Sequence, residues 1–150
     1  MKKIKVVLAD DHAVVRMGFR LLLQDTDDIE VIGEAKNGEE AIKICTETKP
    51  NVLVMDLSMP GMGGLEAIGR ILSKKDSPKV LILSAHEDTI HPKRALKAGA
   101  IGYLSKRGAA EELIKAIRQV SSGTMYVEAI LAQKMAVQQF GADVTPVDVL

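Results

Sequence analysis

The feature that most constrains the fold is a regular alternation of short apolar runs with longer stretches of helical period. Five runs rich in valine and isoleucine are nearly continuous in hydrophobicity: Ile4–Ala9, Ile29–Gly33, Val52–Met55, Val80–Leu83 and Ile101–Leu104. Such runs are typical of strands that are buried on both faces of a parallel sheet. The alternation predicts a doubly wound α/β fold, in which a five-stranded parallel sheet carries helices on both faces through right-handed crossovers.

Composition narrows the class of protein. The 150 residues include 20 basic and 20 acidic side chains, so this chain lacks the surplus of positive charge with which a protein grips nucleic acid by itself. Cys45 is the only cysteine, which excludes internal disulfides and cysteine-built zinc sites. No stretch approaches the roughly 20 apolar residues that span a bilayer. We expect a cytoplasmic protein that makes no membrane contact.

The pattern changes after Gly123, where the last strongly amphipathic stretch has ended. Residues 127–138 can form one more helix with a weak apolar face, and the remaining residues carry Gly, Asp and Pro. We therefore predict a first domain over residues 1–123 and a linker with a helix over residues 124–150.

Polar residues follow the apolar runs at the points where the predicted strands end. They are Asp10 and Asp11 after the first run, Asp56 after the third, Ser84 after the fourth and Lys106 just past the fifth. Each residue alone is more often a turn or helix-capping residue. Because ligands of open parallel sheets bind beyond the carboxyl ends of the strands, the recurrence of these residues at one sheet edge predicts a single pocket.

The residue types in this pocket favour phosphoryl chemistry. Carboxylates gathered together repel one another, and a hard divalent cation such as Mg²⁺ removes that conflict. A carboxylate can attack phosphorus and form an aspartyl phosphate, while a lysine ammonium and a serine hydroxyl hold the phosphoryl oxygens. We therefore expect Mg²⁺ as the cofactor and transfer of a phosphoryl group to Asp56.

Four segments around these residues resemble the receiver domains of bacterial two-component response regulators. The segments are LADDH at 8–12, VMDLSMPGMGGLE at 54–66, LSAH at 83–86 and GYLSK at 102–106. The resemblance covers about residues 3–122, with the marker positions in order. It implies the flavodoxin-like fold of CheY-like receivers.

The resemblance assigns roles around the phosphorylation site by position. It implies that Asp56 accepts the phosphoryl group, that Asp11 binds Mg²⁺ directly, and that Asp10 does so directly or through water. Ser58 matches the position that offers a backbone carbonyl to the metal. Ser58 and His86 also match positions that face the phosphoryl group, and we expect them to help set its lifetime.

Further positions match residues that respond to phosphorylation. Ser84 matches the hydroxyl residue that reaches the phosphoryl group, Lys106 the lysine that pairs with it, and Tyr103 the switch aromatic. Pro60 and Gly64 match the loop after the phosphorylation site. The resemblance implies that Ser84 and Tyr103 shift inward when Asp56 is phosphorylated, so that a local charge change biases a two-state element.

The resemblance also implies partners. The phosphoryl donor would be a sensor histidine kinase or a histidine phosphotransfer protein. Arg107 replaces a proline found in many receivers, and this is similar to the NarL/FixJ subgroup and its GacA/UvrY-type global regulators, in which a LuxR-type helix-turn-helix follows the receiver. We expect this DNA-binding domain to lie beyond the chain, with Leu150 as its opening leucine. We also expect a homodimer, through either the first and fifth helices or the fourth helix and fifth strand.

Two other functions compete with this interpretation. A magnesium-dependent phosphatase of the haloacid dehalogenase type also uses an aspartate nucleophile, but it needs a second aspartate two residues later, where this chain has Ser58. A phosphorylation-independent pseudo-receiver would lack an acidic or lysine marker, and none is lost. We therefore expect that the protein is not an enzyme and that it catalyses only its own phosphorylation and dephosphorylation.

Two further groups of residues could be taken for functional sites, but a structural role explains each of them better. His12, His86 and His91 lack the spacing of a metal-binding set. Cys45 lies on the inner face of a predicted helix and reads as a small core side chain.

Overall fold

The computed structural model describes residues 2–59, 61–84 and 90–143. Its strands are β1 Ile4–Ala9, β2 Ile29–Ala35, β3 Val52–Asp56, β4 Lys79–Ser84, β5 Gly102–Ser105 and β6 Tyr126–Val127. Its helices are α1 Ala13–Gln24, α2 Gly38–Thr48, α3 Gly64–Leu72, α4 Ile90–Lys97, α5 Lys106–Ser121 and α6 Ala129–Asp143. Pro60 and His86 lie outside the described residues.

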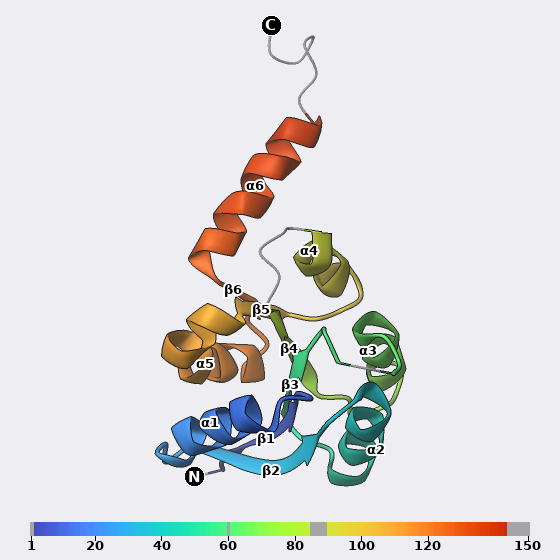
Figure 1. Cartoon of the computed structure of the whole chain (residues 1–150), viewed down its shortest axis with the longest axis vertical. Helices are drawn as coiled ribbons and strands as arrows, with labels where there is room; N and C mark the ends of the chain where they lie inside the picture. Colours follow the sequence, from blue (N-terminus) through green and yellow to red (C-terminus); the bar gives the residue numbers. More distant parts are fainter. Residues whose placement is uncertain (1, 60, 85–89, 144–150) are drawn as a thin grey trace, which may run out of the picture.

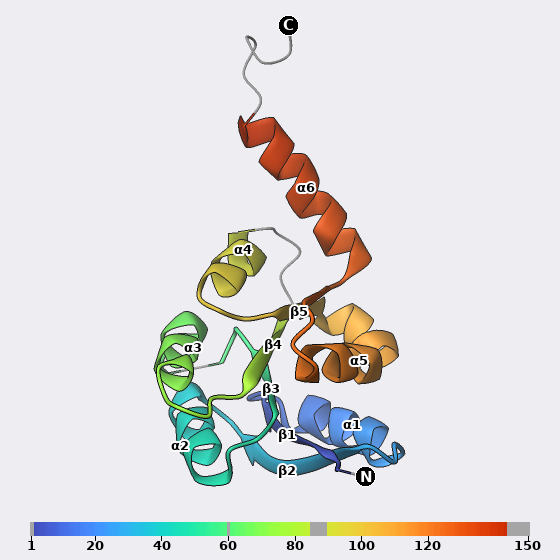
Figure 2. The same ribbon diagram turned by 180° about the vertical axis from the view of Figure 1, so that it is seen from behind.

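The sheet is parallel throughout, with the strand order β2-β1-β3-β4-β5-β6. Helices α1 and α5 cover one face, and α2, α3 and α4 cover the other (Figure 1). Figure 2 shows the same layers from behind. The predicted doubly wound α/β fold is confirmed, and each of the five apolar runs forms a strand of its core.

Two apolar clusters explain why the strand sequences are nearly continuous in hydrophobicity. In β1, Val6 and Leu8 belong to the cluster under α1 and α5, whereas Val7 and Ala9 belong to the cluster under the other helices. Burying one such aliphatic side chain contributes about 2 kcal/mol. The central positions of a strand that lies between two helix layers therefore carry apolar side chains on both faces.

Local signals fix where the helices start. The side chain of Asn37 accepts a hydrogen bond from the Glu40 backbone N–H at 2.8 Å, and the Glu40 carboxylate accepts one from the Lys36 N–H at 3.1 Å. This pair of contacts resembles a capping box and marks the start of α2. At α5 the cap is Ser105, whose side chain accepts from the Gly108 N–H at 3.0 Å.

The segment after α5 contributes a short strand that the sequence did not predict. Tyr126 and Val127 pair in parallel with β5, opposite Gly102 and Tyr103. Helix α6 then leaves the sheet and runs away from it (Figure 1). The division at residue 123 stays a prediction, although part of the predicted linker adds to the sheet. Among the described residues, no helix combines the length and the apolar character needed to cross a lipid bilayer.

Candidate functional site

A buried charge cluster lies at the carboxyl ends of β1, β3 and β5. Asp56, the last residue of β3, has no exposed surface, and Asp10 after β1 is 3% exposed. The Lys106 ammonium lies 2.8 Å from Asp56 Oδ2 and 3.2 Å from Asp10 Oδ2. The predicted convergence of these three residues on one edge of the sheet is therefore confirmed.

The position of Lys106 keeps it charged. Burial acts to lower the pKa of its ammonium, but the hydrogen bond and charge of Asp56, together with the charge of Asp10, outweigh burial and raise the pKa above its ordinary value. The cluster thus holds a permanent positive charge next to two buried carboxylates. Such a charge can stabilise negative oxygens that arrive in the pocket.

The carboxylates form a set that can chelate a metal ion. Asp10, Asp11, His12 and Asp56 each offer one ligand atom, and these atoms lie within 4.8 Å of one another. Asp10 Oδ2 is buried and accepts no hydrogen bond within the described part of the chain, although Lys106 is close enough for an ion pair. Oxygen donors in this number suit a hard cation such as Mg²⁺, which also binds water.

His12 also lies in this cluster, although the spacing of the histidines in the sequence did not predict it. Its Nδ1 lies 3.2 Å from Asp10 Oδ1 and 3.2 Å from Asp11 Oδ1. Its backbone N–H also donates to Asp10 Oδ1 at 2.8 Å. Because the imidazole is largely exposed, it lies at the rim of the pocket, where it orients the Asp10 and Asp11 carboxylates.

Arg16 was also missed, because its role depends on how α1 packs beside β2. Its Nη1 donates to the Asp10 backbone carbonyl, and its Nε donates to Glu34 at 2.9 Å. Glu34 accepts a second hydrogen bond from Arg20 at 2.9 Å. These contacts fix the end of β1 and therefore the direction of the Asp10 side chain.

The loop after Asp56 is held against the site by backbone contacts. The Ser58 N–H donates to Asp56 Oδ1 at 2.9 Å. Gly64 begins α3 so close to this loop that a Cβ would lie 2.8 Å from Leu57 Cδ2 and 3.2 Å from Leu57 Cα. Only glycine fits there without a shift, which gives the predicted loop residue a physical reason.

Ser84 and Tyr103 lie on the neighbouring strands at the same edge. Ser84 ends β4 opposite Ser105, and Tyr103 lies in β5 between Ile82 and Val127. Both side chains are fully buried. The structure thus places both predicted response residues inside the domain, Ser84 in β4 and Tyr103 in β5, the strand that directly precedes Lys106.

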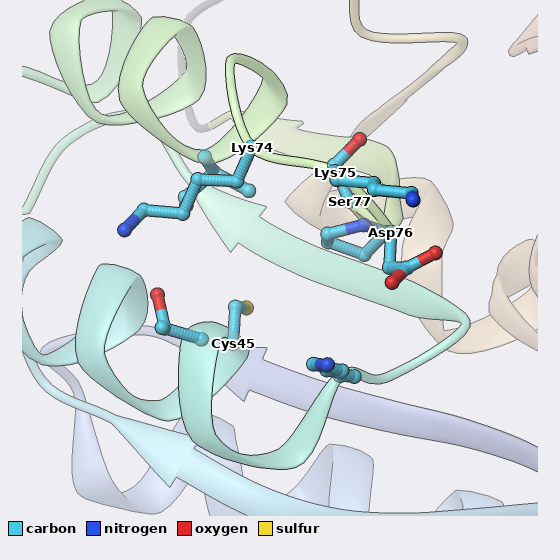
Figure 3. A pocket seen from close by; sticks show the side chains of 9 residues that line it. Cys45, Lys74, Lys75, Asp76 and Ser77 are labelled. Carbon is cyan, nitrogen blue, oxygen red and sulfur yellow. The ribbon is translucent and has the colours of Figure 1, made fainter.

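A second pocket, of about 70 Å³, lies at the amino ends of β3 and β4 (Figure 3). It is lined by Cys45, Thr46, Lys49, Ile71, Lys74, Lys75, Asp76, Ser77 and Pro78. Burial raises the pKa of the Cys45 thiol to about 12, so the sulfur stays protonated and weakly nucleophilic. This observation agrees with the prediction that Cys45 is a small core side chain.

Comparisons with known proteins agree on one family. A family model described as "Response regulator receiver domain" matches residues 6–118. The response regulator UvrY of Escherichia coli K12 is 44% identical over 142 residues, which are 95% of this chain and 65% of UvrY. The response regulator GacA of Pseudomonas aeruginosa PAO1 is 41% identical over 137 residues, which are 91% of this chain and 64% of GacA.

A solved structure gives the same result. The two-component response regulator of the LuxR family from Aurantimonas sp. SI85-9A1 superposes with a TM-score of 0.87 at 33% identity. The match covers 92% of this chain and 99% of that one. The chain spans less than two thirds of the length of UvrY and GacA, at 65% and 64%.

Proposed function

The chain belongs to the response regulator receiver domain family of two-component systems, and from this premise we propose that Asp56 is its phosphoacceptor. The observation that carries the proposal is the buried Asp56 carboxylate, which lies 2.8 Å from the Lys106 ammonium and beside Asp10. A nucleophile, a fixed cation and further oxygen ligands are the parts that phosphoryl transfer to a carboxylate requires.

The transfer can be written from these groups. An oxygen of Asp56 forms a bond to phosphorus while the donor's nitrogen–phosphorus bond breaks, and the electron pair leaves with the donor's imidazole. Lys106, already charged and within hydrogen-bonding distance of Asp56, neutralises the oxygens of the transferred group. The Ser84 hydroxyl would reach one of these oxygens from the end of β4.

Asp10, Asp11 and Asp56 would hold Mg²⁺, with the backbone carbonyl of Ser58 as a further ligand. The fit rests on the buried Asp10 Oδ2, which accepts no hydrogen bond from the residues that the structure describes, and on the closeness of the ligand atoms. When bound, Mg²⁺ neutralises negative charge on the carboxylates and on the phosphoryl oxygens.

The response to phosphorylation would follow from charge. An aspartyl phosphate carries about 1.5 to 2 negative charges at pH 7, in place of the single charge of the carboxylate, at a position where Asp56 has no exposed surface. Ser84 and Tyr103, on adjacent strands at this edge, would repack around it and change the surface near α4 and β5.

Ser58 and His86 would set the lifetime of the phosphoryl group. If exchanging both residues leaves the dephosphorylation rate unchanged, this tuning role is wrong.

The partners follow from the family and from the surface. The phosphoryl donor would be a sensor histidine kinase or a histidine phosphotransfer protein, which must approach the carboxyl edge of the sheet. A DNA-binding domain of the LuxR type would follow residue 150, and this domain would make all contacts to DNA.

For the homodimer, the exposed side chains favour α1. Val14, Met17 and Leu21 are 81%, 51% and 56% exposed and are spaced along one face of α1. The outer edge of β5, by contrast, is already paired with β6. We therefore favour a pairing through α1 and α5 over one through the fourth helix and fifth strand.

Acetyl phosphate tests the proposed function directly. With Mg²⁺, the wild-type chain is expected to form a stoichiometric adduct that is stable in acid, labile in alkali and located at Asp56 by peptide mapping. Removal of Mg²⁺ with EDTA should prevent its formation. Continuous turnover of unrelated phosphoesters would instead favour the phosphatase, and failure to form any adduct would favour the pseudo-receiver.

A further inference from the structure

The segment after α5 returns to the sheet and contacts the corner between β5 and α5. The Glu128 backbone N–H donates to the Tyr103 carbonyl at 3.1 Å, which continues the pairing of β6 with β5. The Glu128 carboxylate accepts two hydrogen bonds from Ser105, from its backbone N–H at 3.3 Å and from its Oγ at 3.0 Å. Ser105 directly precedes Lys106, so Glu128 holds the residue next to the lysine of the site.

The absence of a side chain at residue 108 leaves the space for this carboxylate. A Cβ at Gly108 would overlap Glu128 Oε1. The Gly108 N–H donates to Ser105 Oγ at 3.0 Å, while the same Oγ donates to Glu128. Glu128, Ser105 and Gly108 therefore form one connected set, which we call the Glu128 clamp.

The clamp lies at the point where α5 begins. Ser105 is the N-cap of this helix and Lys106 is its first residue. A carboxylate at a helix N-terminus is stabilised by the free N–H groups and by the helix dipole. Because the cap conformation sets the direction of the first helical side chain, a contact that holds Ser105 also holds the path of Lys106 toward Asp56.

We propose that Glu128 is a positioning residue for phosphoryl transfer, acting through Ser105 to hold Lys106 against the phosphoryl group. The proposal rests on the proposed function of Asp56 and Lys106. Helix α6 begins at Ala129, directly after Glu128, and the Glu128 carbonyl accepts from the Ala132 N–H at 2.8 Å. The clamp therefore couples the state of the site to the attachment of α6, and such coupling is reciprocal.

The first measurement is the rate of Asp56 phosphorylation as a function of acetyl phosphate concentration, with Mg²⁺ present. Glu128→Ala is expected to lower the rate at saturation by about 10-fold, because a misplaced Lys106 loses contact with the transferred group. The half-saturating concentration should stay within about twofold, because the lysine acts mainly in the transition state. Glu128→Gln keeps one acceptor oxygen and should retain an intermediate rate.

Tyr126→Phe is the matched control. The Tyr126 hydroxyl donates to Glu112 and so attaches β6 to α5 at a place that does not touch Ser105. This variant loosens the same segment but leaves the clamp intact, and it should phosphorylate at the wild-type rate. Gly108→Ala should slow the reaction as Glu128→Ala does, because the added methyl group displaces the carboxylate, and it should have no further effect in the Glu128→Ala background.

The second measurement reads the coupling without any turnover. Beryllofluoride with Mg²⁺ mimics the phosphorylated site, and in the wild-type chain it should slow hydrogen exchange at the Tyr126 and Glu128 amides, whose N–H groups bond to β5 and its preceding residue. The protection should disappear in Glu128→Ala.

The outcomes separate the two proposals. If the wild-type chain forms no adduct, the proposed function fails and the role of Glu128 fails with it. If the wild-type chain forms the adduct but Glu128→Ala matches Tyr126→Phe in rate and in exchange, only the positioning role is overturned. A selective loss of rate and of protection in Glu128→Ala and Gly108→Ala supports it.

Discussion

Helix α5 carries an ion pair near each of its ends, and the two pairs differ in almost every physical respect. At the start of the helix, Lys106 contacts Asp56 and Asp10, whose side chains are 0% and 4% exposed. Near its end, Arg118 contacts Asp28 through Nε at 2.8 Å and Nη2 at 2.9 Å, with side chains 52% and 26% exposed. One pair is buried at the carboxyl edge of the sheet, and the other lies in solvent at the amino edge.

The number of charges also differs. Arg118 and Asp28 satisfy each other through two nearly parallel hydrogen bonds. Lys106, by contrast, faces two buried carboxylates with a third, Asp11, close by. Buried charges that are only partly compensated cost stability, and a fold retains them where function needs them. The comparison therefore separates a site that is prepared for a ligand from a contact that is complete.

The largest contrast is expected in phosphorylation by acetyl phosphate. Asp56→Asn removes the nucleophile and should reduce the alkali-labile adduct to background. Asp28→Asn changes the same residue type at the other end of α5 and should leave the rate within about twofold of wild type, because surface changes distant from a site rarely disturb it. Mass spectrometry of the intact chain measures both, and adduct formation in Asp56→Asn would contradict the assignment.

Replacement of the buried cation should have the next largest effect. Lys106→Met leaves Asp56 and Asp10 facing each other without a counter-charge, and we expect the free energy of unfolding to fall by about 3 kcal/mol. Saturating Mg²⁺ should restore more stability to this variant than to the wild type, because a bound cation replaces the lost charge. Urea denaturation with and without EDTA measures both effects.

Lys115→Met is the control for this experiment, because Lys115 is an exposed lysine on the same helix. It should change the free energy of unfolding by no more than about 0.5 kcal/mol. Equal stabilisation of wild type and Lys106→Met by Mg²⁺ would mean that the lysine and the metal do not share the carboxylates.

Two glycines of α3 test how closely the loop beside the buried pair of Asp56 and Lys106 is packed. Gly64→Ala places a methyl group against Leu57 and should destabilise the chain by about 1–2 kcal/mol, because the loop after Asp56 must shift. Gly69→Ala meets nothing within 4 Å and should stabilise the helix by up to about 1 kcal/mol. Thermal unfolding measures the pair, and stabilisation by Gly64→Ala as well as by Gly69→Ala would show that the close approach at Gly64 has no cost.

The contrast between the two ends of α5 also shows how much of the structure can be predicted from the sequence alone. Asp10, Asp56 and Lys106 could be predicted as one site because each follows an apolar run, and parallel strands bring their carboxyl ends together. The strands were predicted because valine and isoleucine fill both of their faces. These signals are local, and the fold class converts them into positions in space.

The features that the sequence did not predict depend on pairings between distant segments, which local sequence patterns do not encode. Strand β6 has only two residues, too few for any periodic signal, and its pairing with β5 is what brings Glu128 to Ser105, 23 residues away. Arg16 and Glu34 likewise meet only after α1 packs beside β2. The roles of Ser58, Ser84 and Tyr103 stay predictions, since the structure gives their positions and not their effects on phosphorylation.

The smallest effect is expected at the exposed pair, and its pH dependence distinguishes it from the buried one. The hydrogen bonds from Arg118 hold the pKa of Asp28 below its ordinary value of 3.8. A carboxyl group whose pKa is lower in the folded state adds stability above its unfolded pKa, and that stability is lost as the pH falls through the folded pKa. Arg118→Gln should therefore lower the melting temperature slightly at pH 7, and the difference from wild type should vanish as the pH falls through the lowered pKa of Asp28. Because both side chains are in contact with solvent, 1 M salt should also shrink the difference at pH 7. A loss of stability that persists in acid and in high salt would mean that Arg118 acts through packing of its aliphatic stem, and the contrast between a solvated and a buried pair would have to be abandoned for this end of the helix.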